Sequence, residues 1–173
     1  RWPDGSLRWA LLDFQGDFAP NEKSEWTLSL AEGRSLVLPS EPVSVSRGPE
    51  GEVEVSTGAL RAVFRPRPFR LIHSLEAEGR TIIGDGMRSD IQLVNTVGKI
   101  FRASLDPAPV LSVEEETPLR VVVRWDGGLF AGDGERLTEY RVKFHFFAGN
   151  PYVKVEHSML NRESPEKGIW LRS

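Results

Sequence analysis

Apolar and polar residues alternate with a period of two along most of the chain, and no segment carries the 3.6-residue stripe of an amphipathic helix. Turn-forming clusters of Gly, Pro, Asn and Asp separate these short runs. Without crossover helices, consecutive strands pair as antiparallel neighbours, so the pattern predicts an all-β antiparallel architecture. Beyond residue 42 the expected strands are 43–45, 53–55, 60–64, 71–75, 81–83, 91–94, 100–103, 110–113 and 119–125.

A long hairpin within residues 137–161 is the best-defined unit. Its two strands each have one apolar and one polar face, and Ala148-Gly149-Asn150-Pro151 supplies the turn. A slip by one residue would bury two cations, so the apolar face is expected to point into the core. On the opposite face, Arg141 and Lys143 are expected to pair with Glu156. The residues expected to face the core are Tyr140, Val142, Phe144, Phe146, Val153, Val155 and Met159.

The segment 119–125 is apolar on both faces in its middle, which predicts a central strand covered on both sides. Further strands are expected near the start of the chain, at 7–14, 26–31 and 36–38. Pro- and Gly-rich segments at 38–42 and 47–51 then suggest a domain boundary. The residues before this boundary are too few to form a closed β-barrel alone. No initiator Met or signal-peptide pattern opens the chain, so we expect a piece of a longer protein.

Composition narrows the class of protein. Of the 173 residues, 39% are hydrophobic and 27% charged, which excludes a disordered or membrane-spanning chain. The net charge of −3 argues against a nucleic-acid partner, because such domains are normally basic. There is no cysteine, which excludes disulfides, thiolate metal sites and cysteine nucleophiles. Composition does not decide whether the protein is secreted, periplasmic or cytoplasmic.

Trp2 and Trp9 flank the densest local motif, a Pro-Asp-Gly-Ser turn. Tryptophan faces pack against the apolar faces of sugar rings, so one interpretation is a stacking platform for carbohydrate. The alternative is that both side chains plug the end of a barrel, because large aromatic residues usually contribute to cores.

A second candidate is the basic, proline-stiffened segment that contains Arg65, Arg67 and Arg70. Guanidinium groups bind carboxylates through two parallel hydrogen bonds, so the segment would suit an acidic polysaccharide. Pro and charge also block the pairing of sheet edges, and the segment could equally guard an edge strand.

Three histidines, His73, His145 and His157, show no metal-ligand spacing, and no metal or other cofactor is expected. His157 lies between Val155 and Met159 on the apolar face of the hairpin. It is interpreted as a histidine at the core or its rim, where it could also contact a sugar, since no partner for a general base is evident. Asp residues in the Gly-rich turns lack the spacing of an EF-hand and are interpreted as turn formers.

The segment Arg1-Trp2-Pro3-Asp4-Gly5-Ser6-Leu7-Arg8-Trp9, followed by Asp13-Phe14, resembles a signature of the exo-rhamnogalacturonan lyase and YetA-like family. Further resemblance lies in 57–61 and 68–72, at the opening of that family's β-sandwich. The hairpin resembles the family at 138–142, 146–153 and 155–157, and 169–173 resembles the strand that follows. The matching segments occur in the family's order along the whole chain.

The resemblance implies a parent with an N-terminal β-barrel, a central β-sandwich and a C-terminal α/α toroid. Residues 1–47 would be the C-terminal part of the RIFT-like barrel, and 48–173 a truncated central sandwich. Lyases of this kind cleave uronic-acid glycosides by β-elimination. No catalytic residue of the family maps onto this chain, so it is expected to be a non-catalytic module. The alternatives are a carbohydrate-binding module or an interdomain scaffold. The implied partners are an acidic polysaccharide or oligosaccharide and the toroid, with no membrane and no nucleic acid.

Overall fold

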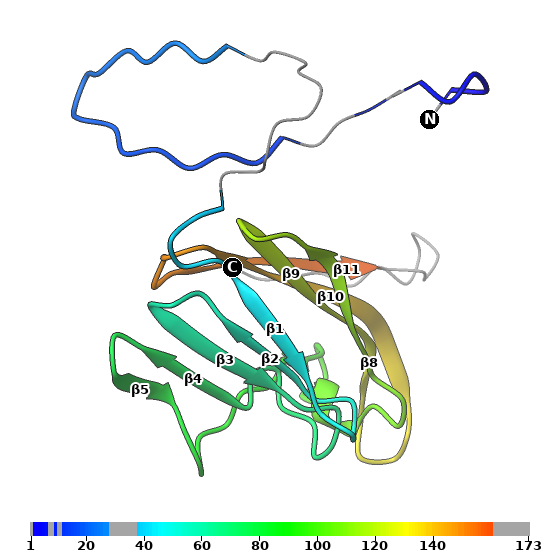
Figure 1. Ribbon diagram of the computed structural model, residues 1–173. Coiled ribbons are helices and arrows are strands. Elements are labelled where there is room, and N and C mark those ends of the chain that lie inside the picture. Colours follow the sequence, from blue (N-terminus) through cyan, green and yellow to red (C-terminus); the bar gives the residue numbers. More distant parts are fainter. Residues whose placement is uncertain (1, 7–8, 10–11, 28–37, 161–173) are drawn as a thin grey trace.

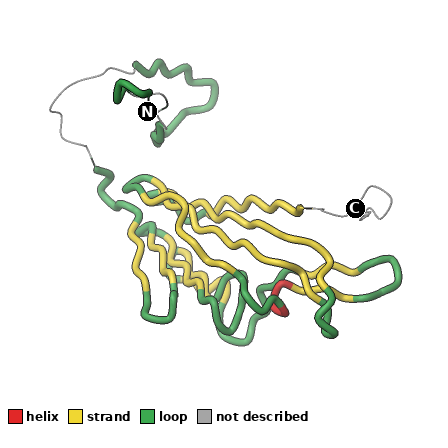
Figure 2. The backbone as a smooth tube through the Cα atoms, turned by 90° about the vertical axis from the view of Figure 1, so that its right-hand side faces the viewer, coloured by secondary structure: helices red, strands yellow, loops and turns green. Residues whose placement is uncertain are grey.

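The computed structural model describes residues 2–6, 9, 12–27 and 38–160. Two antiparallel sheets pack face to face as a sandwich, which confirms the all-β prediction (Figure 1). The second sheet is the longer and more curved layer (Figure 2). A single 3-10 turn, η1 (Ala103–Leu105), is the one helical element among the described residues.

The first sheet has the order β1-β2-β3-β4-β5, and each strand pairs with the next along the chain. The second has the order β11-β10-β9-β7-β6, and β8 also pairs with β9. The strands of the first sheet are β1 (Ser44–Arg47), β2 (Val53–Ser56), β3 (Leu60–Phe64), β4 (Ser74–Ala77) and β5 (Arg80–Ile83). Those of the second are β6 (Gln92–Val94), β7 (Ile100–Arg102), β8 (Val110–Glu116), β9 (Arg120–Phe130), β10 (Arg136–Phe147) and β11 (Val153–Leu160).

Aromatic rings from both sheets form the centre of the core. The ring of Phe64 on β3 lies 5.2 Å from that of Phe144 and 6.0 Å from that of Phe146, both on β10. The ring of Phe69 lies 5.0 Å from that of Trp125 on β9, in an edge-to-face arrangement. The contacts of Phe64 join the two sheets, and Phe69 packs onto the second sheet from the loop that follows β3.

The prediction of a central strand is confirmed at β9. Val121 and Val123 are 0% exposed on the core side, and Val122 is 1% exposed on the opposite side. The strand lies between β10 on one side and β7 and β8 on the other. It is longer than expected, because it continues through Gly127 and Gly128 to Phe130.

The hairpin of β10 and β11 has the expected register, with Tyr140 opposite Met159 and Phe146 opposite Val153. The four core residues of β10 are at most 1% exposed, as predicted. Val155 is different: it pairs with Phe144 but stays 52% exposed. The reason is that β11 is the edge strand of its sheet, so part of its apolar face is not covered.

The charged face of the hairpin uses other partners than those predicted. Lys143 lies opposite Glu156 in the register, but its Nζ lies 2.8 Å from Glu114 Oε2 on β8. Arg141 Nε donates to Asp126 Oδ1 at 2.6 Å, on the neighbouring strand β9. Glu156 instead lies 2.6 Å from the ammonium of Lys154. The expected pairing with Glu156 is therefore wrong, because β8 and β9 bring other carboxylates within reach.

The described residues of the first part contain no strand before β1. Residues 12–14, 26–27 and 38 belong to three predicted strands and are irregular, so the prediction is wrong there; 7–8, 10–11, 28–31 and 36–37 lie outside the described residues. The strand β1, assigned from the sequence to the end of the first unit, pairs with β2 in the sandwich. That residues 1–47 form the end of a barrel stays a prediction.

Candidate functional site

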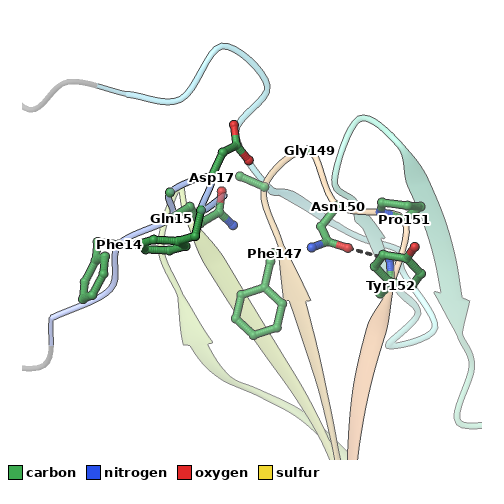
Figure 3. A pocket seen from close by; sticks show the side chains of 11 residues that line it. Phe14, Gln15, Asp17, Phe147, Gly149, Asn150, Pro151 and Tyr152 are labelled. Carbon is green, nitrogen blue, oxygen red and sulfur yellow. Dashed lines mark hydrogen bonds between the residues drawn. The ribbon is translucent and has the colours of Figure 1, made fainter. Parts of the chain in front are cut away.

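A pocket of about 460 Å³ lies between an N-terminal segment and the turn that joins β10 to β11. Residues 14–18 form one wall and residues 147–152 the other (Figure 3). The two walls are far apart in the sequence and meet on the outer face of the second sheet. Phe147, the last residue of β10, lies on this face because it alternates with the core residue Phe146.

The turn wall of the pocket is fixed by hydrogen bonds to the first sheet. The Gly149 N–H donates to the Thr57 carbonyl at 2.7 Å, and the Thr57 hydroxyl donates to the Asn150 carbonyl at 2.9 Å. Gly149 has a φ of +66°, which favours glycine at this position. The Asn150 side chain accepts the Tyr152 N–H at 2.8 Å (Figure 3). Thr57 is fully buried, so the turn is held on a rigid base.

The N-terminal wall is built around a cluster of three aromatic residues, Phe14, Phe18 and Trp26. The ring of Trp26 lies 4.9 Å from that of Phe14 and 6.4 Å from that of Phe18. Each of the three is more than half exposed. The segment is attached to the sandwich by an ion pair between Asp13 and Arg120 of β9, at 3.4 Å.

The chemistry of the lining is aromatic and polar. Four aromatic side chains line the pocket: Phe14, Phe18, Phe147 and Tyr152. Gln15, Asn150 and Asp17 add two amides and one carboxylate. Apolar faces with a few hydrogen-bonding groups suit a neutral or weakly polar ring with hydroxyl groups. Among the described residues, the lining holds no histidine, and Asp17 is its one carboxylate.

The structure places Trp2 and Trp9 outside this pocket. The motif at Trp2 is a tight turn, in which the Gly5 N–H donates to the Trp2 carbonyl at 2.9 Å. Asp4 accepts hydrogen bonds from the backbone and the hydroxyl of Ser6, which lower the pKa of its carboxyl. Trp2 is 53% exposed and Trp9 82% exposed. The choice between a stacking platform and a barrel plug stays open.

The basic segment follows the end of β3 and is held by Phe69, which packs on Trp125. Arg65 Nη1 lies 2.7 Å from His73 Nε2, and Arg65 Nε lies 2.5 Å from a carboxylate oxygen of Glu52. Arg67 donates to the carbonyl of Pro107. The segment 65–68 is not a strand in the structure. Arg65 and Arg70 thus lie near His73, for which the sequence predicts no role.

His157 lies on β11 opposite Val142, on the side of the strand that faces the core. It is solvent-exposed, as is its neighbour Val155. Partial desolvation lowers the pKa of its imidazole. It does not lie among the residues that line the pocket.

Among the described residues, no group of three or more His, Asp or Glu side chains is placed to hold a metal ion. No helix in that part of the chain is long and apolar enough to cross a membrane.

Sequence reasoning missed most of the pocket. The turn at 148–151 was identified as a turn, but not as one wall of a cavity. Phe14 and Phe18 flank Gly16, and a Cβ at that glycine would lie 3.2 Å from the Trp26 ring. This close approach is visible only in the structure, and the alternation of apolar and polar residues does not reveal it.

Two sheets packed around one aromatic core, with a rigid hairpin turn at one end of the layers, define this chain as a β-sandwich module. The chain belongs to the PcRGLX-like protein family, because residues 43–170 match the part described as its central beta sandwich domain. The match begins just before β1. It confirms the resemblance to the rhamnogalacturonan lyase and YetA-like family.

One curated relative is the uncharacterized protein YetA of Bacillus subtilis (strain 168), which is 24% identical over 165 residues. The aligned part covers 92% of this chain and 19% of the relative. The chain thus spans about a fifth of that protein's length.

Acidification is expected to destabilise the fold through His73. Burial, followed by the charges of Arg65 and Arg70, lowers the pKa of this imidazole, while Asp85 and Glu52 oppose the shift. The unfolded chain, with a histidine pKa of about 6.5, therefore binds the proton more tightly. The contribution of neutral His73 to the free energy of unfolding is fully present above about pH 6.5, and it is lost as the pH drops toward the folded-state pKa. The denaturant midpoint of the unmodified chain should fall from about pH 7.5 to about pH 5.5, and it should fall by less in His73→Gln. An equal fall in both proteins would contradict this prediction.

Proposed function

We propose that this chain is a non-catalytic β module of a polysaccharide-lyase-like protein, and that it contacts the sugar chain at the pocket between residues 14–18 and 147–152. The parent protein would cleave rhamnogalacturonan, or a related glycan that contains uronic acid, by β-elimination. The reacting groups would lie in another part of that protein, an α/α toroid domain. This module would hold the polysaccharide and position it.

The observation that carries the proposal is the lining of the pocket. Tyr152 is 74% exposed, although its backbone is fixed by the Asn150 side chain. An exposed aromatic side chain on a rigid turn is pre-organised for stacking, because little conformational freedom is lost on binding. The amides of Gln15 and Asn150 and the carboxylate of Asp17 can exchange hydrogen bonds with sugar hydroxyls. Membership of a family described by a central β-sandwich supports the view that the module works beside other domains.

The alternative is a scaffold that has no ligand of its own. In that case the exposed cluster of Phe14, Phe18 and Trp26 would pack against another domain of the longer protein. The two functions differ in one measurable property, since the isolated chain binds glycan in a way that depends on Tyr152 only if the pocket is a sugar site.

The proposal is tested by titrating the 173-residue chain with rhamnogalacturonan oligosaccharides and following binding by calorimetry. Tyr152→Ala should weaken binding by about tenfold, the loss expected when an aromatic anchor is truncated. Val97→Ala is the matched control, because Val97 is 84% exposed and lies in the turn between β6 and β7, away from the pocket lining. No binding by the unmodified chain would favour the scaffold.

The lyase part of the proposal has a separate test. The full-length protein should release unsaturated sugar products that absorb in the ultraviolet, while the 173-residue chain alone should release none. The reacting groups would lie in another domain of the full-length protein, which is the reason for the second expectation. Product formation by the short chain at the rate of the full-length protein would contradict the assignment as non-catalytic.

A further inference from the structure

The loop after β3 contains hydrogen-bond donors that the described part of the protein leaves unused. His73 Nδ1 and Arg70 Nη1 are both buried and have no hydrogen-bond partner among the described residues. Buried donors are normally satisfied, and an unpaired one costs free energy. Each of these two atoms therefore has hydrogen-bonding capacity that a ligand could satisfy.

The contact with Arg65 fixes the tautomer of His73. Guanidinium nitrogens can only donate, so at the 2.7 Å contact with Arg65 Nη1 the His73 Nε2 atom must be the acceptor. The proton of the neutral ring then lies on Nδ1, which becomes a donor. Arg65, Arg70 and His73 thus all present N–H groups, and both guanidinium charges are close enough to lower the pKa of the imidazole.

The backbone of this loop is held in place from several sides. The Trp125 indole donates to the Leu71 carbonyl at 3.0 Å, and the Leu71 N–H donates to the Ser89 carbonyl at 2.8 Å. The His73 N–H donates to the Val63 carbonyl at 2.8 Å. These bonds fix the backbone that carries the donors, as a binding site requires.

One carboxylate already occupies part of the site. Glu52, in the turn before β2, places Oε1 2.5 Å from Arg65 Nε. The Arg65 side chain remains 41% exposed and that of Glu52 32% exposed, so the pair is open to solvent and to exchange. Such an exposed ion pair contributes little to stability, and a second carboxylate can replace its acid partner.

We propose that Arg65, Arg70 and His73 bind a carboxylate, and that Glu52 occupies the site until that ligand displaces it. That the carboxylate belongs to an acidic sugar rests on the function proposed above. Arg65 would provide the charge-assisted contact that Glu52 now makes. His73 Nδ1 and Arg70 Nη1 supply the donors that are unpaired without ligand. This site follows the end of β3, whereas the pocket is anchored at Thr57, just before β3 begins. It is therefore a second site, independent of the pocket.

The test compares D-galacturonate with D-galactose, two sugars that differ by a carboxylate in place of a hydroxymethyl group, and with acetate. Binding to the 173-residue chain is followed by calorimetry and by the NMR signal of the His73 ring. Galacturonate should bind and galactose should not. Arg65→Gln and Arg70→Gln should each weaken galacturonate binding by about tenfold or more, the loss expected for a bond to a charged group.

Glu52→Gln should act in the opposite direction and tighten binding several-fold, because it removes the competing carboxylate. Arg80→Gln, a change at an exposed arginine at the start of β5, is the control and should have no effect. Tyr152→Ala should not weaken galacturonate binding either, which separates this site from the pocket. The proposal is wrong if galactose or acetate binds as tightly as galacturonate, or if Arg70→Gln and Glu52→Gln both leave the affinity unchanged.

Discussion

Replacing Phe144 by Ala should lower the free energy of unfolding by about 3–5 kcal/mol, the usual cost of truncating a fully buried phenylalanine. Phe144 is 1% exposed, and its ring packs 5.2 Å from that of Phe64 on the facing sheet. Truncation leaves a cavity between the layers at the centre of the core. A domain with a total stability of about 5–15 kcal/mol would lose a large share of it. Urea unfolding followed by tryptophan fluorescence measures the change.

Lys143→Ala is the matched control from the opposite face of β10. Its ammonium pairs with Glu114 at the surface, where such an ion pair contributes little, so the cost should stay below about 1 kcal/mol. Equal losses of unfolding free energy in the two variants would mean that the assignment of the core and solvent faces of the hairpin is wrong.

The second large effect is expected at Gly127, which lies directly opposite Tyr140 in the pairing of β9 with β10. A Cβ at this position would lie 2.6 Å from the Tyr140 hydroxyl and 2.7 Å from Asp106 Oδ2. Both neighbours are buried, and Asp106 is fixed by the Gly128 and Ala108 N–H groups. Gly127→Ala should therefore destabilise the fold by about 1–3 kcal/mol, as overpacking of a core does.

Gly132→Ala provides the comparison, because nothing lies within 4 Å of a Cβ there. This exposed site should tolerate the change or gain slightly, since alanine restricts the unfolded chain. The two variants are compared by their thermal midpoints. A midpoint for Gly127→Ala equal to that of Gly132→Ala would show that the tyrosine and the aspartate can move aside.

The sandwich could be predicted from alternation because burial determines which face of a strand is apolar. Phe144 and Lys143 are adjacent in sequence and have opposite environments, as their types require. Ionic partners were harder to predict, since long side chains reach past the nearest strand. Lys143 contacts Glu114 on β8 rather than the residue opposite it on β11.

Neither the pocket nor the cluster of Arg65, Arg70 and His73 could be predicted from the alternation of apolar and polar residues. The pocket requires residues 14–18 to lie opposite residues 147–152 (Figure 3), and this depends on the path of an irregular segment. Alternation suggested a strand through Phe14, but the described residues there form no ladder. His73 could not be linked to Arg65 from the sequence, because an irregular loop separates them and alternation does not predict its path. In the structure Arg65 Nη1 lies 2.7 Å from His73 Nε2.

The most direct test of the central claim is an NMR titration of the 173-residue chain with a rhamnogalacturonan oligosaccharide. If the chain holds carbohydrate at the pocket, the backbone amide signals of residues 14–18 and 147–152 should shift together and saturate with one affinity. The signals of the turn between β6 and β7, around Val97, should stay in place. Shifts confined to other parts of the sandwich, or no shifts at saturating oligosaccharide, would contradict the assignment of the pocket as a sugar site.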